Sequence, residues 1–208
     1  ALIKAVLFDY DGVLVDSLEL NHIGTCAVLR AAGLKEITFQ EFCEQYEAPY
    51  TKFYADLGIK DTREQIKSWY LKEVLKYPDP PLMEDVEMVL TTLADAGLTL
   101  GIVSTHSYNH LIRQLEKNLL FGFFRSIVGD QEIKTGAISS FCRLFNFQPK
   151  EVLFVGDLPS DIRDGNTAGV TTVFFKGKFS VPARYPADYR IKTLTEILAI
   201  LEQRRTSV

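Results

Sequence analysis

Five short apolar runs that do not alternate in polarity are the feature that most constrains the fold of this chain. They are rich in Val, Ile, Leu and Phe, and they cover residues 5–8, 98–103, 126–128, 152–155 and 171–175. A run of this kind is typical of a strand buried on both faces, as in a parallel sheet. Helical patterns lie between and after these runs, at residues 84–96, 108–117, 137–145, 161–168 and 194–203. This alternation predicts an α/β fold, a Rossmann-like three-layer sandwich around a central parallel sheet.

One long stretch, from about residue 17 to residue 77, contains helical patterns only. The expected helices cover residues 20–32, 39–47, 50–57 and 64–76. The segment 77–81, which reads Tyr-Pro-Asp-Pro-Pro, then ends any helix because proline lacks the amide N–H. We therefore expect a small all-helical cap domain at residues 17–82, inserted into a core of residues 1–16 and 83–208. Its hinges are expected near residues 13–17 and 77–82.

Composition and charge exclude several classes of protein. The chain has 208 residues, enough to bury a core without a disulfide or metal, and its net charge of −4 argues against nucleic-acid binding. No apolar run approaches the roughly 20 residues of a membrane span. Cys26, Cys43 and Cys142 show no C-x-x-C spacing, so we expect small buried residues in a reducing compartment. The first residues do not resemble a signal peptide, and we expect a cytoplasmic monomer or weak homodimer.

Two pairs of acidic residues follow predicted strands. Asp9 and Asp11 come after the first run, and alternate residues of an extended strand point the same way. They should therefore converge at the carboxyl edge of the sheet, where ligands of open parallel sheets bind. Asp157 follows the fourth run, and Asp161 falls in the first turn of the next helix. Either of the latter alone would more often cap a helix, but together the four carboxylates favour a Mg²⁺ site.

Four further residues suit a phosphate group. Gly12 frees the backbone to turn sharply and to approach an anion closely. Ser104 and Thr105 follow the second run and could offer a hydroxyl and backbone N–H groups, although such a pair alone usually caps a helix. Lys134 lies in a polar loop after the third run, where a single lysine is usually a solvated surface charge.

Together these motifs resemble the haloacid dehalogenase superfamily, in its phosphatase branch with a helical cap. Residues 9–17 are similar to the family's D-x-D-G-[TV]-x-x-D-S motif, and residues 156–169 to its G-D-x-x-x-D motif with a terminal A-G. Ser104 and Lys134 match its second and third motifs. The match covers residues 3–176, and residues 187–191 resemble the family's last strand. Two departures, Thr135 in place of Pro and Thr105-His106 in place of Asn, fall where the family contributes largely backbone.

The resemblance implies a Mg²⁺-dependent phosphatase that acts through an aspartyl-phosphate. Asp9 would be the nucleophile, and Asp11 would protonate the leaving oxygen and later deprotonate the attacking water. Mg²⁺ would be held by Asp9, the backbone carbonyl of Asp11 and Asp157. Asp161 would bind the metal or its waters, or orient Lys134.

The same resemblance suggests which residues contact the substrate. Ser104 and Lys134 would hold the phosphoryl oxygens, with Gly12 and Thr105 beside them. His106 could touch the leaving group, although a surface or capping histidine is an equal alternative.

In the cap, Tyr50 and Lys52 lie in a predicted turn between helices, where such proteins present specificity residues. The aromatic set of the cap is expected to form its core rather than a ligand box. A small phosphorylated metabolite such as phosphoglycolate or a sugar phosphate is the expected substrate.

Two alternatives stay open at this point. A mutase of the β-phosphoglucomutase type keeps both aspartates of the first motif but places a His five residues after Asp16, where this chain has Asn21 followed by His22. A non-catalytic phospho-Asp signalling or binding protein of the receiver type would be much shorter and would carry no helical insertion. Asp11 argues against dehalogenases and phosphonoacetaldehyde hydrolases, which lack it.

Overall fold

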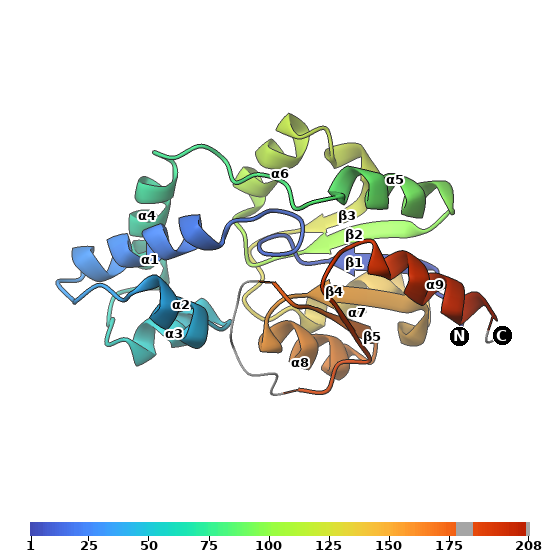
Figure 1. Cartoon of the computed structure of the whole chain (residues 1–208). Helices are drawn as coiled ribbons and strands as arrows, with labels where there is room; N and C mark the ends of the chain where they lie inside the picture. The colour runs from blue at the N-terminus through green and yellow to red at the C-terminus, as the bar shows by residue number, and fades with distance from the viewer. Residues whose placement is uncertain (178–184, 207–208) are drawn as a thin grey trace.

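A computed structural model describes residues 1–177 and 185–206 of the chain. A parallel sheet lies at the centre of the α/β part of the fold (Figure 1). Six strands pair in the order β3-β2-β1-β4-β5-β6, and each neighbouring pair is parallel. The strands are β1 (Ala5–Phe8), β2 (Thr99–Val103), β3 (Phe124–Val128), β4 (Val152–Gly156), β5 (Thr171–Phe175) and β6 (Tyr189–Ile191). The predicted Rossmann-like α/β fold is confirmed.

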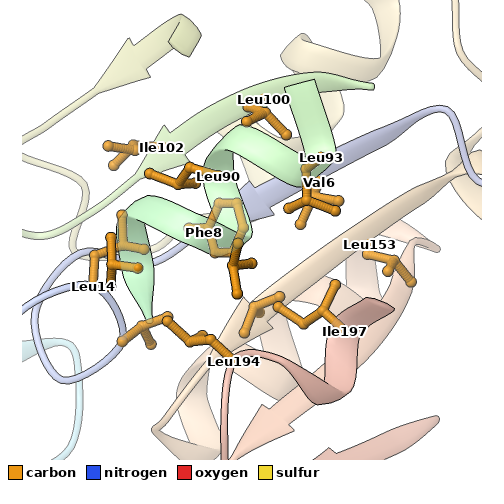
Figure 2. Packing of buried hydrophobic residues seen from close by; sticks show 14 of the residues in the cluster. Val6, Phe8, Leu14, Leu90, Leu93, Leu100, Ile102, Leu153, Leu194 and Ile197 are labelled. Atoms are coloured by element: carbon orange, nitrogen blue, oxygen red, sulfur yellow. The ribbon is translucent and has the colours of Figure 1, made fainter. Parts of the chain in front are cut away.

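Both faces of the sheet are covered by helices, which explains why the strand sequences do not alternate in polarity. Val6 and Phe8 pack with the apolar side chains of α5 (Val86–Asp95), α6 (Tyr108–Lys117) and α9 (Glu196–Thr206). Figure 2 shows the part of this cluster that includes Leu90 and Leu93 of α5 and Ile197 of α9. Ala5 and Leu7 point to the other face and pack with α7 (Thr135–Leu144), next to which lies α8 (Pro159–Ala168). Every residue of β1 is therefore buried.

Element boundaries differ from the predicted ones by a few residues, for local reasons. Helix α5 begins at Val86 rather than at residue 84, because Asp85 adopts a left-handed conformation with φ 63°. Helix α8 begins two residues earlier than predicted, at Pro159, whose fixed φ suits the first helical turn. Two short 3₁₀ helices, η1 (Phe121–Phe123) and η2 (Pro149–Glu151), precede β3 and β4. The parts of the predicted core at residues 178–184 and 207–208 lie outside the described residues.

Four helices between β1 and α5 form a group with its own apolar core. They are α1 (Leu18–Ala31), α2 (Phe39–Gln45), α3 (Tyr50–Asp56) and α4 (Arg63–Val74). Leu29, Phe42 and Phe53 are buried among them. Thr38 begins α2 with a capping box, in which its hydroxyl accepts from the N–H of Glu41 and the Glu41 carboxylate accepts from the N–H of Thr38.

The two connections between this helical group and the sheet run side by side. The N–H of Asp16 donates to the carbonyl of Pro81, and the N–H of Met83 donates to that of Leu14, both at 2.9 Å. Val15 and Leu82 form an antiparallel bridge between them. These are the predicted hinge segments, and the domain boundaries drawn there stay a prediction.

All three cysteines are buried, as predicted. Within residues 1–177 and 185–206, no helix combines the length and the apolar character that a membrane crossing requires.

Replacing Leu93 by Ala should lower the free energy of unfolding by about 2–5 kcal/mol, because this side chain of α5 is fully buried against the sheet and would leave a cavity. Urea denaturation followed by circular dichroism measures the change. Met88→Ala, on the exposed side of the same helix, is the matched control and should stay within about 0.5 kcal/mol of the parent protein. Equal losses in both variants would contradict this packing.

Candidate active site

The candidate site lies where the strand order of the sheet changes direction. β1 is paired with β2 on one side and with β4 on the other, so the carboxyl ends of these three strands lie next to one another. Asp9 follows β1, Ser104 follows β2 and Asp157 follows β4. Ligands of open parallel sheets bind at such a switch point, because the connections diverge there and leave a crevice.

Three carboxylates and one ammonium group are buried together at this point. Asp9, Asp157 and Asp161 each offer an oxygen, and these oxygens all lie within 4.8 Å of one another. The Nζ of Lys134 lies 2.7 Å from Asp9 Oδ2 and 2.7 Å from Asp161 Oδ1. When all four groups are ionised, the cluster carries a net charge of −2. Hard carboxylate oxygens with this excess negative charge fit a divalent cation of the Mg²⁺ or Ca²⁺ type.

Burial opposes ionisation of this cluster when no cation neutralises it. Desolvation, aided by the neighbouring carboxylate of Asp161, raises the pKa of Asp9 to about 7, although Lys134 acts against the rise. Desolvation and the charges of Asp161 and Asp9 raise the pKa of Asp157 well above its usual range. Burial alone would lower the pKa of Lys134, but its two carboxylate partners raise it. Lys134 is therefore charged, and the cost of the excess negative charge appears in the raised pKa values of Asp9 and Asp157.

Two glycines allow the acidic residues to approach so closely. Gly12 has φ +75°, and a Cβ there would lie 2.0 Å from Asp157 Oδ2. A Cβ on Gly156 would lie 2.3 Å from the Cβ of Asp161. Helix α8 can consequently begin directly behind the end of β4 and bring Asp161 next to Asp157.

Backbone N–H groups orient two of the carboxylates. Asp9 Oδ1 accepts a hydrogen bond of 2.7 Å from the N–H of Tyr10, and Asp161 Oδ2 accepts one of 3.0 Å from the N–H of Leu158. Both aspartates thus have one oxygen on the backbone and the other on Lys134. Their side chains are positioned before any ligand arrives.

Lys134 is a buried residue of the site rather than the solvated loop lysine that its sequence context favours. Its side chain is 3% exposed, and it stands as the residue before α7. Its N–H donates to Asp164 Oδ2 at 2.6 Å, and Asp164 in turn forms an ion pair with Arg163. Sequence reasoning missed Asp164, although its position three residues after Asp161 places both on one side of α8.

The loop after β2 supplies the remaining polar groups. Ser104 is fully buried, and its Oγ accepts a hydrogen bond of 3.1 Å from the N–H of His106. The carbonyl of Ser104 accepts from the N–H of Gln131 at 3.0 Å, which ties this loop to the one that carries Lys134. Thr105 lines the cavity in front of the site.

His106 contacts Asp11, a pairing that the sequence does not reveal. Its Nδ1 lies 2.8 Å from Asp11 Oδ2, and its Nε2 lies 3.0 Å from Nδ1 of His110. Burial acts against both charges, but their mutual attraction prevails, so the pKa of Asp11 is lowered and that of His106 is raised. Burial, followed by the charge of His106, lowers the pKa of His110. These shifts favour the charged forms of Asp11 and His106 and the neutral form of His110.

Side-chain contacts connect this histidine pair to the second predicted hinge segment, residues 77–82. The side-chain amide of Gln114 donates to Asp79 Oδ1 at 3.0 Å and lies 3.4 Å from Nε2 of His110. Arg113 and Lys117 form ion pairs with Asp79, at 2.9 and 2.8 Å. Through Asp79, helix α6 therefore contacts the segment that connects the helical group to α5.

A cavity of about 120 Å³ lies between the helical group and the carboxyl edge of the sheet. Its core side includes Asp9, Asp11, Gly12, Thr105, His106, Lys134 and Asp157. Tyr50, for which a substrate contact is predicted, also lines it. Lys52 is not among the lining residues: this exposed side chain forms an ion pair with Asp56, one helical turn later. A contact of Tyr50 or Lys52 with the substrate stays a prediction.

The aromatic residues of the helical group divide between two environments. Phe42 and Phe53 lie in its apolar core, which agrees with the expectation of a cap core. Tyr54 belongs to this core and also reaches the cavity, and Tyr46 and Tyr70 line the cavity as well. Part of the set thus faces a ligand site, which the helical periodicity alone did not separate from the core.

Two ion pairs join the helical group to the loop between β3 and α7. Lys67 lies 2.5 Å from Asp130, and Arg63 lies 2.9 Å from Glu132. The hydroxyl of Thr51 also donates to Glu132, at 2.7 Å. These contacts hold the helical group over the site.

Comparisons with known proteins show what the chain is similar to. A family model described as haloacid dehalogenase-like hydrolase matches residues 6–175. The chain is 25% identical to a pyrophosphatase PpaX of Listeria monocytogenes, with 96% of each chain covered. It is 24% identical to a phosphoglycolate phosphatase of Synechococcus elongatus, with 96% of this chain and 98% of that protein covered.

Solved structures show the same fold. A predicted phosphatase from Clostridium acetobutylicum superposes with a TM-score of 0.83 at 20% identity, covering 97% of this chain and 100% of the other. A haloacid dehalogenase-like family protein from Streptococcus pneumoniae gives a TM-score of 0.78 at 20% identity, covering 95% and 98%.

Divalent cations should stabilise the protein more at pH 7.5 than at pH 5. The raised pKa values of Asp9 and Asp157 mean that the folded, metal-free protein holds protons that the unfolded chain has lost. Its stability therefore falls as the pH rises from about 4 to about 7. A cation binds the ionised carboxylates, and at 100 times its Kd it adds about 2.7 kcal/mol, or roughly 5–10 °C in Tm.

Thermal unfolding with Mg²⁺ or with a chelator, at both pH values, measures this effect. Asp157→Asn should abolish the Mg²⁺-induced shift, whereas Asp56→Asn, an exposed aspartate, should preserve it. A shift of equal size at pH 5 and pH 7.5 would contradict the expectation.

Proposed function

Because the chain belongs to the haloacid dehalogenase-like hydrolase family, we propose that it is a Mg²⁺-dependent phosphatase acting on a small phosphate monoester. The observation that carries the proposal is the buried cluster of Asp9, Asp157, Asp161 and Lys134 at the switch point of the sheet. The names of its relatives, a pyrophosphatase and a phosphoglycolate phosphatase, support a phosphorylated substrate.

The carboxylates of Asp9 and Asp157 and the backbone carbonyl of Asp11 would hold the Mg²⁺ ion, with Asp161 behind them. The net charge of −2 on the buried cluster supports a divalent ion in this place. When bound, the ion screens the repulsion between the Asp9 carboxylate and the incoming phosphate.

Asp9 acts as the nucleophile. One of its carboxylate oxygens attacks phosphorus in line, the bond between phosphorus and the ester oxygen breaks, and an aspartyl-phosphate forms. The N–H of Tyr10 and the Nζ of Lys134 hold this carboxylate in a fixed orientation. Little rearrangement is then needed to reach the geometry of attack.

Asp11 and His106 supply the proton that the leaving group needs. The pair shares one proton between Asp11 Oδ2 and His106 Nδ1, and Asp11 transfers this proton to the leaving oxygen. In the second half of the reaction Asp11 takes a proton from a water molecule, which attacks the same phosphorus and breaks its bond to Asp9. Inorganic phosphate leaves, and both aspartates return to their starting states.

Lys134, the hydroxyl of Ser104 and backbone N–H groups near Thr105 hold the phosphoryl oxygens, where negative charge builds up in the transition state. The helices of residues 17–82 form the cap that excludes bulk water and chooses the substrate. The mutase alternative loses support because His22 does not line the cavity: its Nε2 lies 2.8 Å from the carbonyl of Ile37, and Asn21 faces the cavity instead.

Asp9→Asn should lower kcat by about three orders of magnitude or more, because an amide oxygen is a poor nucleophile and the covalent step is lost. Release of p-nitrophenol from p-nitrophenyl phosphate with Mg²⁺ measures the loss, and circular dichroism checks the fold. Asp56→Asn is the control and should retain full activity. Activity near that of the parent protein in Asp9→Asn would rule out the nucleophile assignment.

Asp11→Asn should affect substrates according to their leaving groups. An alkyl phosphate needs a proton on its leaving oxygen, so its kcat/KM should fall by about 10²–10⁴. p-Nitrophenolate leaves without a proton, so the loss with p-nitrophenyl phosphate should be clearly smaller. Losses of the same size for both substrates would contradict the role of Asp11 as the proton donor.

A further inference from the structure

The cap side of the cavity is built from uncharged side chains with a single exception. Its polar members from α1 to α4 are hydroxyls and one amide, on Asn21, Thr25, Tyr46, Tyr50, Tyr54 and Tyr70. Aliphatic side chains of the same helices lie between them. Lys67 is the one charged residue that the described part of α1 to α4 adds to this wall.

The charge of Lys67 is already neutralised. Its Nζ lies 2.5 Å from Asp130 Oδ1, while the other oxygen of Asp130 accepts from the N–H of Tyr108 at 3.0 Å. Burial would raise the pKa of Asp130, but these two hydrogen bonds lower it, so the aspartate is ionised. Arg63, one turn earlier on α4, is bound to Glu132 and does not line the cavity. The described cap wall therefore offers no uncompensated positive charge.

The hydroxyls of the wall stay neutral and can serve as donors and acceptors. The Tyr70 hydroxyl donates to Asn21 Oδ1 at 2.6 Å, and the hydroxyls of Tyr54 and Thr25 lie 3.3 Å apart. Burial raises the pKa of both tyrosines. Such groups exchange hydrogen bonds readily with the hydroxyls of a bound ligand. A carboxylate or a second phosphate against this wall would instead lose its hydration without gaining an uncompensated cation, and it would lie near the charge of Asp130.

We propose that the leaving group of the substrate is uncharged and bears hydroxyls, so that the protein hydrolyses the phosphate ester of a polyol rather than a substrate with a second anionic group. This inference rests on the proposed phosphatase function and adds the chemical class of its substrate. The proposed substrate differs from the compounds after which two relatives are named, phosphoglycolate and pyrophosphate. Each of these two compounds carries a second negatively charged group.

Three small substrates test the proposal with Mg²⁺: 2-hydroxyethyl phosphate, 2-phosphoglycolate and pyrophosphate. The first two have the same chain length and differ by a hydroxymethyl group in place of a carboxylate. The expected result is a kcat/KM at least about tenfold higher for 2-hydroxyethyl phosphate than for either of the others. Equal or higher values for an anionic substrate would overturn the inference alone. Failure to hydrolyse these three and p-nitrophenyl phosphate would overturn the phosphatase function itself, and the inference with it.

Two variants test the neutralised lysine directly. Asp130→Asn releases Lys67 and should raise the ratio of kcat/KM for 2-phosphoglycolate to that for 2-hydroxyethyl phosphate by about two- to fivefold, the effect of one new surface ion pair. Glu132→Gln is the matched control: it releases Arg63, which does not line the cavity, so the ratio should not change. An unchanged ratio in Asp130→Asn, with the variant folded by circular dichroism, would overturn the role of the Lys67–Asp130 pair.

Discussion

The ion pairs of Lys134 with Asp9 and Asp161 are the interaction on which the rest of this structure depends. Charges buried this deeply are costly unless they are paired and hydrogen-bonded, and removal of one partner from a buried pair costs about 3–5 kcal/mol. Here one ammonium serves two carboxylates, while backbone N–H groups satisfy the remaining oxygens. The third carboxylate, Asp157, leaves the cluster with excess negative charge, which fits the proposed cation site better than a purely structural salt bridge.

The position of this cluster follows from the topology of the sheet. β1 lies between β2 and β4, so residues far apart in the chain meet at one edge. The insertion after β1 leaves from the same edge, and its two connections run together as an antiparallel pair. The helical group thus covers the acidic cluster because the chain leaves the sheet there. His106, His110 and Gln114 extend the contacts of Asp11 to Asp79, so Asp11 and the second connection to the helical group share one chain of side-chain contacts.

The acidic cluster and the opposite wall of the cavity come from different parts of this fold. The acids, Ser104 and Lys134 come from the carboxyl edge of the sheet. The opposite wall comes from α1 to α4, where tyrosines and Asn21 dominate. Two relatives named for different phosphate compounds match the chain about equally well, so overall similarity does not choose between their substrates. The charge of the cap wall is the property on which the proposed substrate class rests.

The sequence by itself determined the α/β fold, the order of its elements and the set of acidic residues after β1 and β4. A strand that is buried on both faces has a recognisable apolar sequence, and an acidic residue directly after such a strand lies at the edge of the sheet.

The tertiary structure decided the contacts between residues distant in the chain. The residues around Lys134 are typical of a solvated loop, and only the family resemblance indicated a site residue; in the folded chain it is buried and paired with Asp9 and Asp161. Lys52 pairs with Asp56. His106 meets Asp11 across 95 positions, and Lys67 meets Asp130 across 63. Hydrophobic periodicity reports which face of an element is buried, whereas the pairing of polar groups depends on distances that only the packed chain sets.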